Sequence, residues 1–201
     1  MTVAQGEQFN PANYSDPMVS RILDAAEQSI RRFGIRRMSM GEVARIGKLS
    51  RGSIYRHFGD KDALVEGVFR RLQQGFLNRT EALLEKQTTL VDKLTESVVH
   101  GREDINEGIF ASLAETEPET VATMFLDVGF YQRSVAFWPP HIEMARAQGE
   151  ISPDVDVALA TDFIMRLVVS LVIFPNMGKP LASRRAIKSY LRQVIESGLG
   201  G

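Results

Sequence analysis

The chain has 201 residues, of which 44% are hydrophobic and 24% charged, and its 24 Lys and Arg residues nearly balance 25 Asp and Glu residues. These values are typical of a soluble globular protein and exclude a disordered or fibrous chain. The absence of cysteine excludes a disulfide framework, a thiol nucleophile and a thiolate zinc site. The N-terminus lacks the pattern of a signal peptide, and the most apolar run, 167–174, is too short to span a bilayer, so we expect a cytoplasmic protein.

The charges are divided unevenly along the chain. Ten basic and four acidic residues lie between positions 18 and 61, whereas the segment 87–201 is acidic overall. Such asymmetry indicates an anionic partner for the basic half, although a basic solvated surface gives the same count. The net charge of −1 therefore does not exclude a nucleic-acid partner.

The first predicted elements are two helices. Apolar residues recur at helical spacing from Met18 to Phe33, which predicts one helix face, and Gly34 is expected to end that helix as a C-cap glycine. Ser39 lies three residues before Glu42, the spacing of a capping box, and predicts the start of a second, short helix.

Two further helices are predicted next. Ser50 is expected to cap a third helix, in which Ile54 and Phe58 lie on the buried side, and Asp60 to cap a long fourth helix that runs to about Glu85. Two short helices that are joined by a tight turn and braced by a preceding helix form a helix-turn-helix. The second helix of such a unit lies in the major groove of DNA.

The remainder of the chain continues the helical pattern and shows no alternating strand pattern. Pro118 predicts the first turn of a helix, and the pair Pro139 and Pro140 must kink or restart another. Ser152 is expected to open a long helix that is apolar around much of its circumference. We therefore predict an all-α protein with about nine helices.

The third predicted helix has a composition that suits DNA. Within one and a half turns it gathers the hydrogen-bonding side chains of Arg51, Ser53, Tyr55, Arg56 and His57. Arginine can pair bidentately with guanine, and serine can bond to base edges or phosphate. Ser50 leaves the positive helix N-terminus as an anion site, and Gly52 lets the backbone approach a groove wall. Two alternatives remain open: a core position for Tyr55 and a plain surface position for His57.

Residues 18–70 resemble the DNA-binding domain of TetR-type (tetracycline-repressor-like) transcriptional regulators. The resemblance depends on the runs ILDAAEQSIRRFG and SMGEVARIGKLSRGSIYRHFGDKDALV. It implies a three-helix DNA-binding domain at 17–70 and a helical effector-binding and dimerisation domain at 71–201. It also implies a homodimer on palindromic double-stranded DNA. The segment 1–16, which is polar and carries Gly, Pro and Asn, is predicted to be a flexible arm.

The resemblance assigns contacts to individual residues. It implies phosphate contacts for Ser39 and Lys61, base-edge contacts for Arg51 and Ser53, and sugar–phosphate contacts for Tyr55 and His57. Arg56 is a further candidate because of its charge and its place on the helix. One departure lies in the turn, where the family usually has Ala-Gly and this chain has Gly47 and Lys48. Lys48 is therefore expected at a position that favours positive φ, at a cost of about 1 kcal/mol.

Two predictions concern the C-terminal half. A helix that is apolar nearly all round needs cover on both sides, and a second copy of the chain can supply it in a four-helix bundle; the alternative is an ordinary core helix. The predicted dimer interface consists of Phe163, Leu167, Val168, Leu171, Ile187, Leu191 and Val194. Aromatic and sulfur side chains are predicted to line an effector pocket, although cores use the same residue types. These are Phe110, Met124, Phe125, Tyr131, Phe137, Trp138, His141 and Met144.

The sequence offers little for catalysis, a cofactor or a metal. His100 and Asp104 lie at helical spacing, but two ligands do not fill the four positions of a usual zinc site. We find no nucleophile–base arrangement or phosphate loop to defend. The predicted function is a transcriptional repressor that a small-molecule effector releases from DNA. The alternatives are a DNA-binding architectural or protein-interaction protein without an effector, and a helical enzyme whose basic N-terminus binds an anionic substrate.

Overall fold

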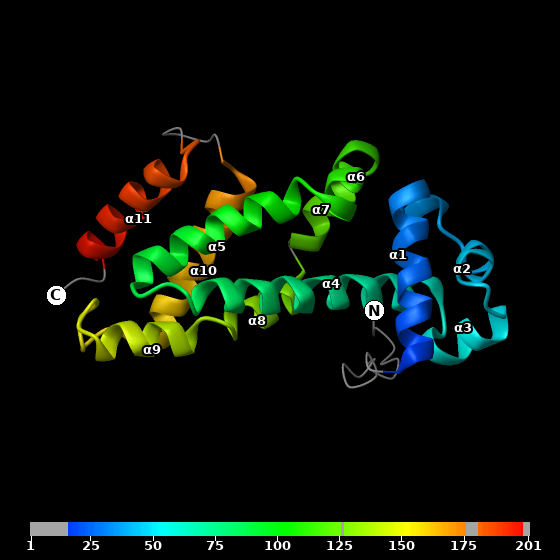
Figure 1. The fold of residues 1–201 in the computed structure, drawn as a ribbon, viewed down its shortest axis with the longest axis horizontal. Coiled ribbons are helices and arrows are strands. Elements are labelled where there is room, and N and C mark those ends of the chain that lie inside the picture. Colours follow the sequence, from blue (N-terminus) through cyan, green and yellow to red (C-terminus); the bar gives the residue numbers. More distant parts are fainter. Residues whose placement is uncertain (1–15, 126, 176–180, 199–201) are drawn as a thin grey trace, which may run out of the picture. The chain divides into compact units, whose positions relative to one another are not determined.

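The computed structural model describes residues 16–125, 127–175 and 181–198, and every regular element in these ranges is a helix (Figure 1). The predicted all-α class is confirmed. The helices are α1 (Pro17–Arg37), α2 (Met40–Gly47), α3 (Arg51–Phe58), α4 (Lys61–Leu84), α5 (Leu90–Ile105), α6 (Gly108–Thr116), α7 (Pro118–Phe125), α8 (Val128–Val135), α9 (Pro139–Ala147), α10 (Val157–Ile173) and α11 (Arg184–Gly198). Of the predicted arm at 1–16, residues 1–15 lie outside the described part of the chain.

The helix boundaries agree with the sequence at several caps and differ at two. The expected end of α1 at Gly34 is wrong, because Gly34 forms a kink inside the helix, which runs on to Arg37. α7 begins at Pro118 and α9 restarts at Pro139, as the prolines predict. The expected start of α10 at Ser152 is wrong, because the helix begins only after Asp156, whose carboxylate accepts the backbone N–H of Leu159 at 2.9 Å. The Ser152 hydroxyl instead accepts from the backbone two residues later and closes a local turn.

The helices form two compact units. Unit 1 comprises residues 1–74 together with 108–122, and unit 2 comprises 75–107 together with 123–201. The sequence placed a single border after residue 70, so it did not anticipate that a segment beyond α5 packs with the N-terminal helices. α4 begins in unit 1 and ends in unit 2.

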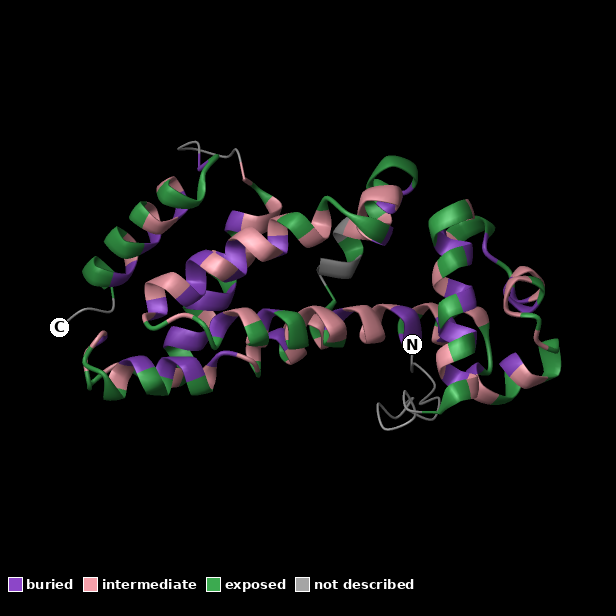
Figure 2. Ribbon diagram, in the orientation of Figure 1, coloured by how far each residue is buried: buried purple, intermediate pink, exposed green. Residues whose placement is uncertain are grey.

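Unit 1 is built around the apolar face of α1. In Figure 2, buried residues alternate with exposed and intermediate ones along α1, at the spacing of one helix face. Its core joins side chains of α1, α2, α3, α4 and α6, among them Ile22, Leu23, Ile30, Val43, Ile54, Phe58, Leu64, Val68, Ile109 and Leu113. Because α3 and α6 both bury side chains in this core, the same core holds both helices in position.

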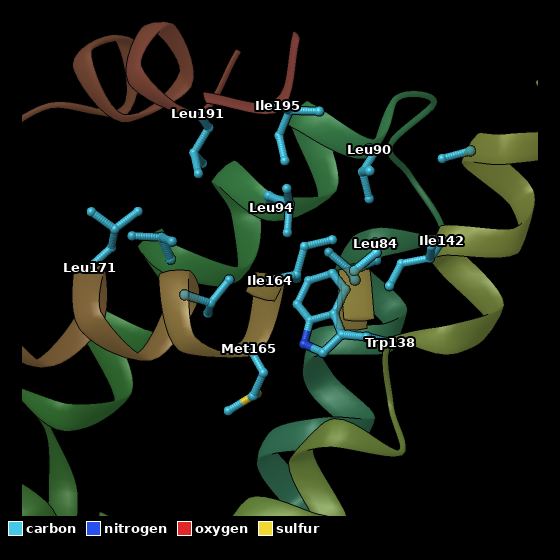
Figure 3. Packing of buried hydrophobic residues seen from close by; sticks show 14 of the residues in the cluster. Leu84, Leu90, Leu94, Trp138, Ile142, Ile164, Met165, Leu171, Leu191 and Ile195 are labelled. Carbon is cyan, nitrogen blue, oxygen red and sulfur yellow. The ribbon is translucent and has the colours of Figure 1, made fainter. Parts of the chain in front are cut away.

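Unit 2 packs α5 against both α10 and α11, with α9 against α10. Figure 3 shows the apolar side chains of unit 2 converging from these helices. The Trp138 indole lies beside Ile164, and Leu84 is part of the same group. Burial of such aliphatic and aromatic surface is the main stabilising contribution to a helical unit of this kind. No helix within the described ranges is long and apolar enough to cross a membrane.

Candidate nucleic-acid interface

Serine caps begin both helices of the predicted helix-turn-helix. The Ser39 hydroxyl accepts the backbone N–H of Glu42 at 3.2 Å, and the Ser50 hydroxyl accepts that of Ser53 at 3.0 Å. These contacts satisfy backbone donors that the first turn of a helix otherwise leaves unpaired. In a full capping box the Glu42 carboxylate would accept the backbone N–H of Ser39, but here it accepts hydrogen bonds from the Arg45 side chain instead. These hydrogen bonds lower the pKa of Glu42.

The turn between α2 and α3 contains the strained residue that the sequence predicts. Lys48 has φ 51° and ψ 49°, and it is the only non-glycine residue with positive φ in the described part of the chain. The Arg21 side chain of α1 donates to the carbonyls of Gly47 at 2.9 Å and Lys48 at 3.2 Å. A Cβ on Gly47 would lie 3.0 Å from the Cβ of Ala25, so the displaced glycine allows close approach to α1. The contacts from α1 thus hold the turn in place despite its strain.

α3 presents a polar surface above a buried apolar one. Ile54 and Phe58 are almost fully buried in the core of unit 1, which orients the helix. Tyr55 is 49% exposed, so the alternative of a core position for this aromatic is wrong. The other predicted contact residues of this segment are exposed or partly buried: Ser50, Arg51, Gly52 and Arg56 are exposed, and Ser53 and His57 are intermediate.

Two predicted phosphate contacts lie at other helix starts. Ser39 is exposed at the start of α2, and Lys61 opens α4 with its ammonium donating to the carbonyl of Arg36 at 3.1 Å. The guanidinium of Arg51 rests against Gly41, where an added Cβ would meet it at 2.5 Å. The sequence analysis did not single out Gly41, although its missing side chain leaves room for the guanidinium.

The predicted effector residues separate into different parts of the structure. Phe110 is partly buried and packs against the core of unit 1, where its ring centroid lies 6.2 Å from that of Phe69. The side chains of Met124 and Phe125 lie outside the described residues. Tyr131 donates a hydrogen bond to Asp162 in unit 2. This hydrogen bond raises the pKa of Tyr131 and, after the larger effect of Arg166, lowers that of Asp162.

The other four predicted effector residues come together in unit 2. The rings of Phe137, Trp138 and His141 are mutual neighbours, with centroids 5.1 to 5.9 Å apart. His141 and Met144 in turn both contact Lys93 of α5. The structure therefore gathers a continuous aromatic group beside a cationic side chain.

Lys93 and His141, which are buried, form a polar chain with Glu81, whose side chain is 46% exposed. Each of Lys93 and His141 is only 6% exposed. The Lys93 ammonium lies 3.4 Å from Nδ1 of His141 and 3.8 Å from the sulfur of Met144, while Nε2 of His141 lies 3.1 Å from a Glu81 carboxylate oxygen. Burial lowers the pKa of His141, and the nearby Glu81 carboxylate opposes that shift. A neutral His141 donates to Glu81 from Nε2 and accepts from Lys93 at Nδ1.

The sequence analysis missed Lys93 and Glu81. A signal for Lys93 was present, since it lies on the same helix face as Leu90, Leu94 and Ser97, all of which are buried. A lysine on a buried face needs polar partners, because burying an unpaired charge is costly. No group of three or more metal-ligating side chains is found among the described residues.

The predicted dimer residues divide into core and surface positions. Val168, Leu171, Ile187 and Leu191 are buried in the core of unit 2, so packing within one chain already accounts for them, and the alternative of ordinary core positions holds for these four. Phe163 is 37% exposed, and Leu167 and Val194 are partly buried. Leu159 on α10 and Phe174, the residue that follows this helix, join Phe163 as large exposed apolar side chains, an apolar stripe that the sequence analysis did not identify.

Comparisons with known proteins agree with this geometry. Residues 22–68, which span most of α1 and all of α2 and α3, match the family model of bacterial regulatory proteins of the tetR family. The chain is 25% identical over 191 residues to the HTH-type transcriptional regulator UidR of Escherichia coli K12, covering 92% of this chain and 95% of UidR. It is 24% identical over 169 residues to the HTH-type transcriptional repressor KstR2 of Mycolicibacterium smegmatis, covering 81% of each.

The fold is also found in solved structures. The transcriptional regulator FadR from Bacillus subtilis, in complex with stearoyl-CoA, superposes with a TM-score of 0.57 at 18% identity, covering 90% of this chain and 98% of that one. Together with the helix-turn-helix geometry, these likenesses define a class: helical DNA-binding regulators. Residues 22–68 thus match the DNA-binding domain of the tetR family, and the chain is similar over most of its length to HTH-type transcriptional regulators.

Proposed function

We propose that this regulator is a repressor that binds a palindromic operator as a homodimer and leaves it when a small molecule binds to unit 2. The observation that carries the proposal is α3, which buries Ile54 and Phe58 and leaves Tyr55, Arg51 and Arg56 at the surface. A repressor acts by occupying its site, and a relative that covers most of the chain, KstR2, is described as a repressor.

In this proposal α3 enters the major groove. Arg51 and Ser53 read base edges, since these side chain types bond to guanine and to base edges generally. The remaining predicted contact residues, Ser39, Ser50, Gly52, Tyr55, Arg56, His57 and Lys61, lie along the phosphates and sugars. Backbone contacts of this kind fix the register of the protein on the duplex, and base contacts give the sequence preference.

The exposed apolar stripe of α10 supports a homodimer. Leu159 and Phe163 on α10 and Phe174 just after its end are large exposed apolar side chains, and a two-fold partner that presents the same stripe would cover them. A dimer of helix-turn-helix units binds two half-sites about 34–36 Å apart, one turn of DNA. Replacement of Phe163 by Glu is expected to convert a dimeric protein into a monomer in sedimentation analysis, whereas Glu in place of exposed Ser189 leaves it dimeric.

The polar chain of unit 2 supports an effector site. Lys93 and His141 place polar groups next to Phe137, Trp138 and Met144, and small-molecule sites combine an apolar lining with a few polar groups. FadR, which shares the fold, is described in complex with stearoyl-CoA. A ligand that prefers one conformer of unit 2 would weaken DNA binding by a coupling energy of about 1–3 kcal/mol. α4, which continues from one unit into the other, is the covalent route for that coupling.

Selection of DNA from a random pool tests the proposal directly. The full chain is expected to enrich two inverted half-sites whose centres lie about 10 base pairs apart. The protein with Tyr55 replaced by Ala, whose fold is checked by circular dichroism, is expected to enrich them much less. Enrichment of a single unpaired site would contradict the dimer, and wild-type enrichment by the Tyr55 variant would contradict the assignment of α3.

A further inference from the structure

Glu117 is a buried carboxylate at the junction of α6 and α7, inside unit 1. Its side chain belongs to a residue only 4% exposed. One carboxylate oxygen, Oε1, accepts the backbone N–H of Arg36 at 3.0 Å, and the other, Oε2, accepts the hydroxyl of Thr120 at 3.3 Å. Glu117 therefore ties the start of α7 to the end of α1, 81 residues away in sequence.

The carboxylate lies where the backbone of α1 leaves its helical course. Gly34 has φ 77° and ψ 167°, a conformation that favours glycine, and a Cβ at this position would lie 2.3 Å from Oε1 of Glu117. The missing side chain of Gly34 thus provides both the kink and the space for the carboxylate. Met38, four residues later, donates its backbone N–H to the carbonyl of Gly34 at 3.1 Å and leads directly into the Ser39 cap.

Other contacts fix the same segment. Arg36 is held at three points: its N–H by Glu117, its guanidinium by Glu119 and its carbonyl by Lys61. The Ser112 hydroxyl of α6 donates to the carbonyl of Arg31 at 2.9 Å. Two of the three ties on Arg36 come from the α6–α7 segment, which follows α5 of unit 2 in the chain.

We propose that Glu117 is a positioning residue for DNA binding: by accepting the Arg36 N–H, it fixes where α1 ends and α2 begins, and so sets the placement of Ser39 and α3. Without an acceptor, the N–H of Arg36 loses its partner in a partly buried place, which is unfavourable, and the junction relaxes. This inference rests on the proposed function, in which α3 reads DNA. It adds that a segment beyond α5 in the chain, which carries Glu117, controls DNA binding by α3.

Three variants test the proposal on the full chain. Glu117→Ala removes the acceptor, Glu117→Gln keeps a carbonyl acceptor without the charge, and Glu115→Ala removes a nearby exposed carboxylate as a control. The probe is the DNA that wild-type protein selects from a random pool. Dissociation constants are measured below the unfolding temperature of every variant, together with amide hydrogen exchange of residues 36–43.

Glu117→Ala is expected to weaken DNA binding about tenfold or more and to speed exchange at the junction by a similar factor. Glu117→Gln is expected to stay within about threefold of wild type, since a neutral carbonyl can still accept the N–H. Glu115→Ala should match wild type in both measurements. This rescue by the amide separates positioning from a general loss of stability.

Several results would overturn the inference. These are unchanged DNA binding and exchange in folded Glu117→Ala, and a loss with Glu117→Gln as large as with Ala. If Glu117→Ala does not fold, Glu117→Asp withdraws the oxygen by one methylene and is expected to show the same tenfold loss; wild-type binding by that variant would contradict the claim. If wild-type protein selects no DNA, the proposed function fails, and unchanged exchange in the variants would separately refute the role of Glu117 at the junction.

Discussion

Unit 1 and unit 2 place their polar side chains in opposite ways. In unit 1, α3 leaves Arg51 and Arg56 at the surface and Tyr55 half-exposed. In unit 2, Lys93 and His141 are almost fully buried and bond to each other and to neighbours within the chain. A large rigid partner such as DNA is reached only by side chains at the surface, whereas a small molecule can be recognised in the interior. The contrast is the one expected if, as proposed, unit 1 binds DNA and unit 2 binds an effector.

The border between the two units is not a single point in the sequence. Ile109 and Leu113 of α6 are buried in the core of unit 1, although α5 before them and α8 after them belong to unit 2. The chain therefore passes from unit 1 to unit 2 within α4, returns for 108–122 and leaves again. The core of unit 1 is complete only with a segment that follows α5.

The largest expected effect tests this assignment of α6. Leu113→Ala in unit 1 and Leu94→Ala in unit 2 both truncate fully buried leucines and should each cost about 2–5 kcal/mol of unfolding free energy. Hydrogen exchange should increase first in α1 for Leu113→Ala and first in α5 and α10 for Leu94→Ala. Loss of protection confined to unit 2 in the Leu113 variant would show that α6 belongs there.

The next effect concerns the exposed surface of α3. Arg51→Ala should weaken binding to the selected DNA by about 1–3 kcal/mol, because a bidentate contact with a base is lost. The matched change Arg146→Ala removes one positive charge from unit 2 and should alter the affinity little. Fluorescence anisotropy with labelled duplex gives both values. Equal losses in the two variants would assign the effect to overall charge and not to α3.

A smaller effect is expected at the turn of unit 1. Lys48→Gly should raise the stability of unit 1 by up to about 1 kcal/mol, since glycine adopts positive φ without the cost that a lysine bears. Lys86→Gly is the control, because Lys86 is exposed and does not have a positive φ, and this change should not stabilise the protein. Denaturant unfolding measures both. A Lys48→Gly variant no more stable than wild type would show that the Arg21 contacts relieve the strain.

The smallest effect is a pH dependence in unit 2. The folded pKa of His141 is lowered, mainly by burial, and the facing charged groups are Glu81, which opposes the shift, and Lys93, which adds to it. The unfolded chain therefore binds a proton near pH 6.5 that the folded chain binds only at lower pH. The stabilising contribution is present above about pH 6.5 and is lost as the pH falls. The midpoint of thermal unfolding should fall less between pH 7.5 and 5.5 in His141→Gln than in wild type; an equal fall would contradict this cause.

The helix α3 and its polar face could be predicted because the evidence for them is local. Ser50, Gly52 and Tyr55 stand in one continuous run, and their caps and spacing fix a helix with one polar face. The positive φ of Lys48 was also predicted, because it follows from the shift of a glycine within the turn. Local hydrogen bonds and backbone preferences are encoded within a few residues, so the sequence alone shows them.

Long-range packing could not be predicted in the same way. The apolar spacing of α6 indicates a buried face but does not say which core receives it, and the sequence gave no sign that Glu117 would reach Arg36. The same limit applies to α10, where Val168 and Leu171 are buried within one chain and only Phe163 remains exposed. Helical periodicity predicts that a face is covered and leaves open what covers it.

The dependence of DNA affinity on salt tests most directly the claim that unit 1 reads DNA through a basic surface. Each phosphate neutralised by Lys or Arg contributes about −0.9 to the slope of log K against log salt concentration on duplex DNA. Wild-type protein on its selected site should show a straight line with a slope steeper than about −3 between 50 and 200 mM salt, corresponding to several phosphate contacts. An affinity that does not change over this range would contradict the account.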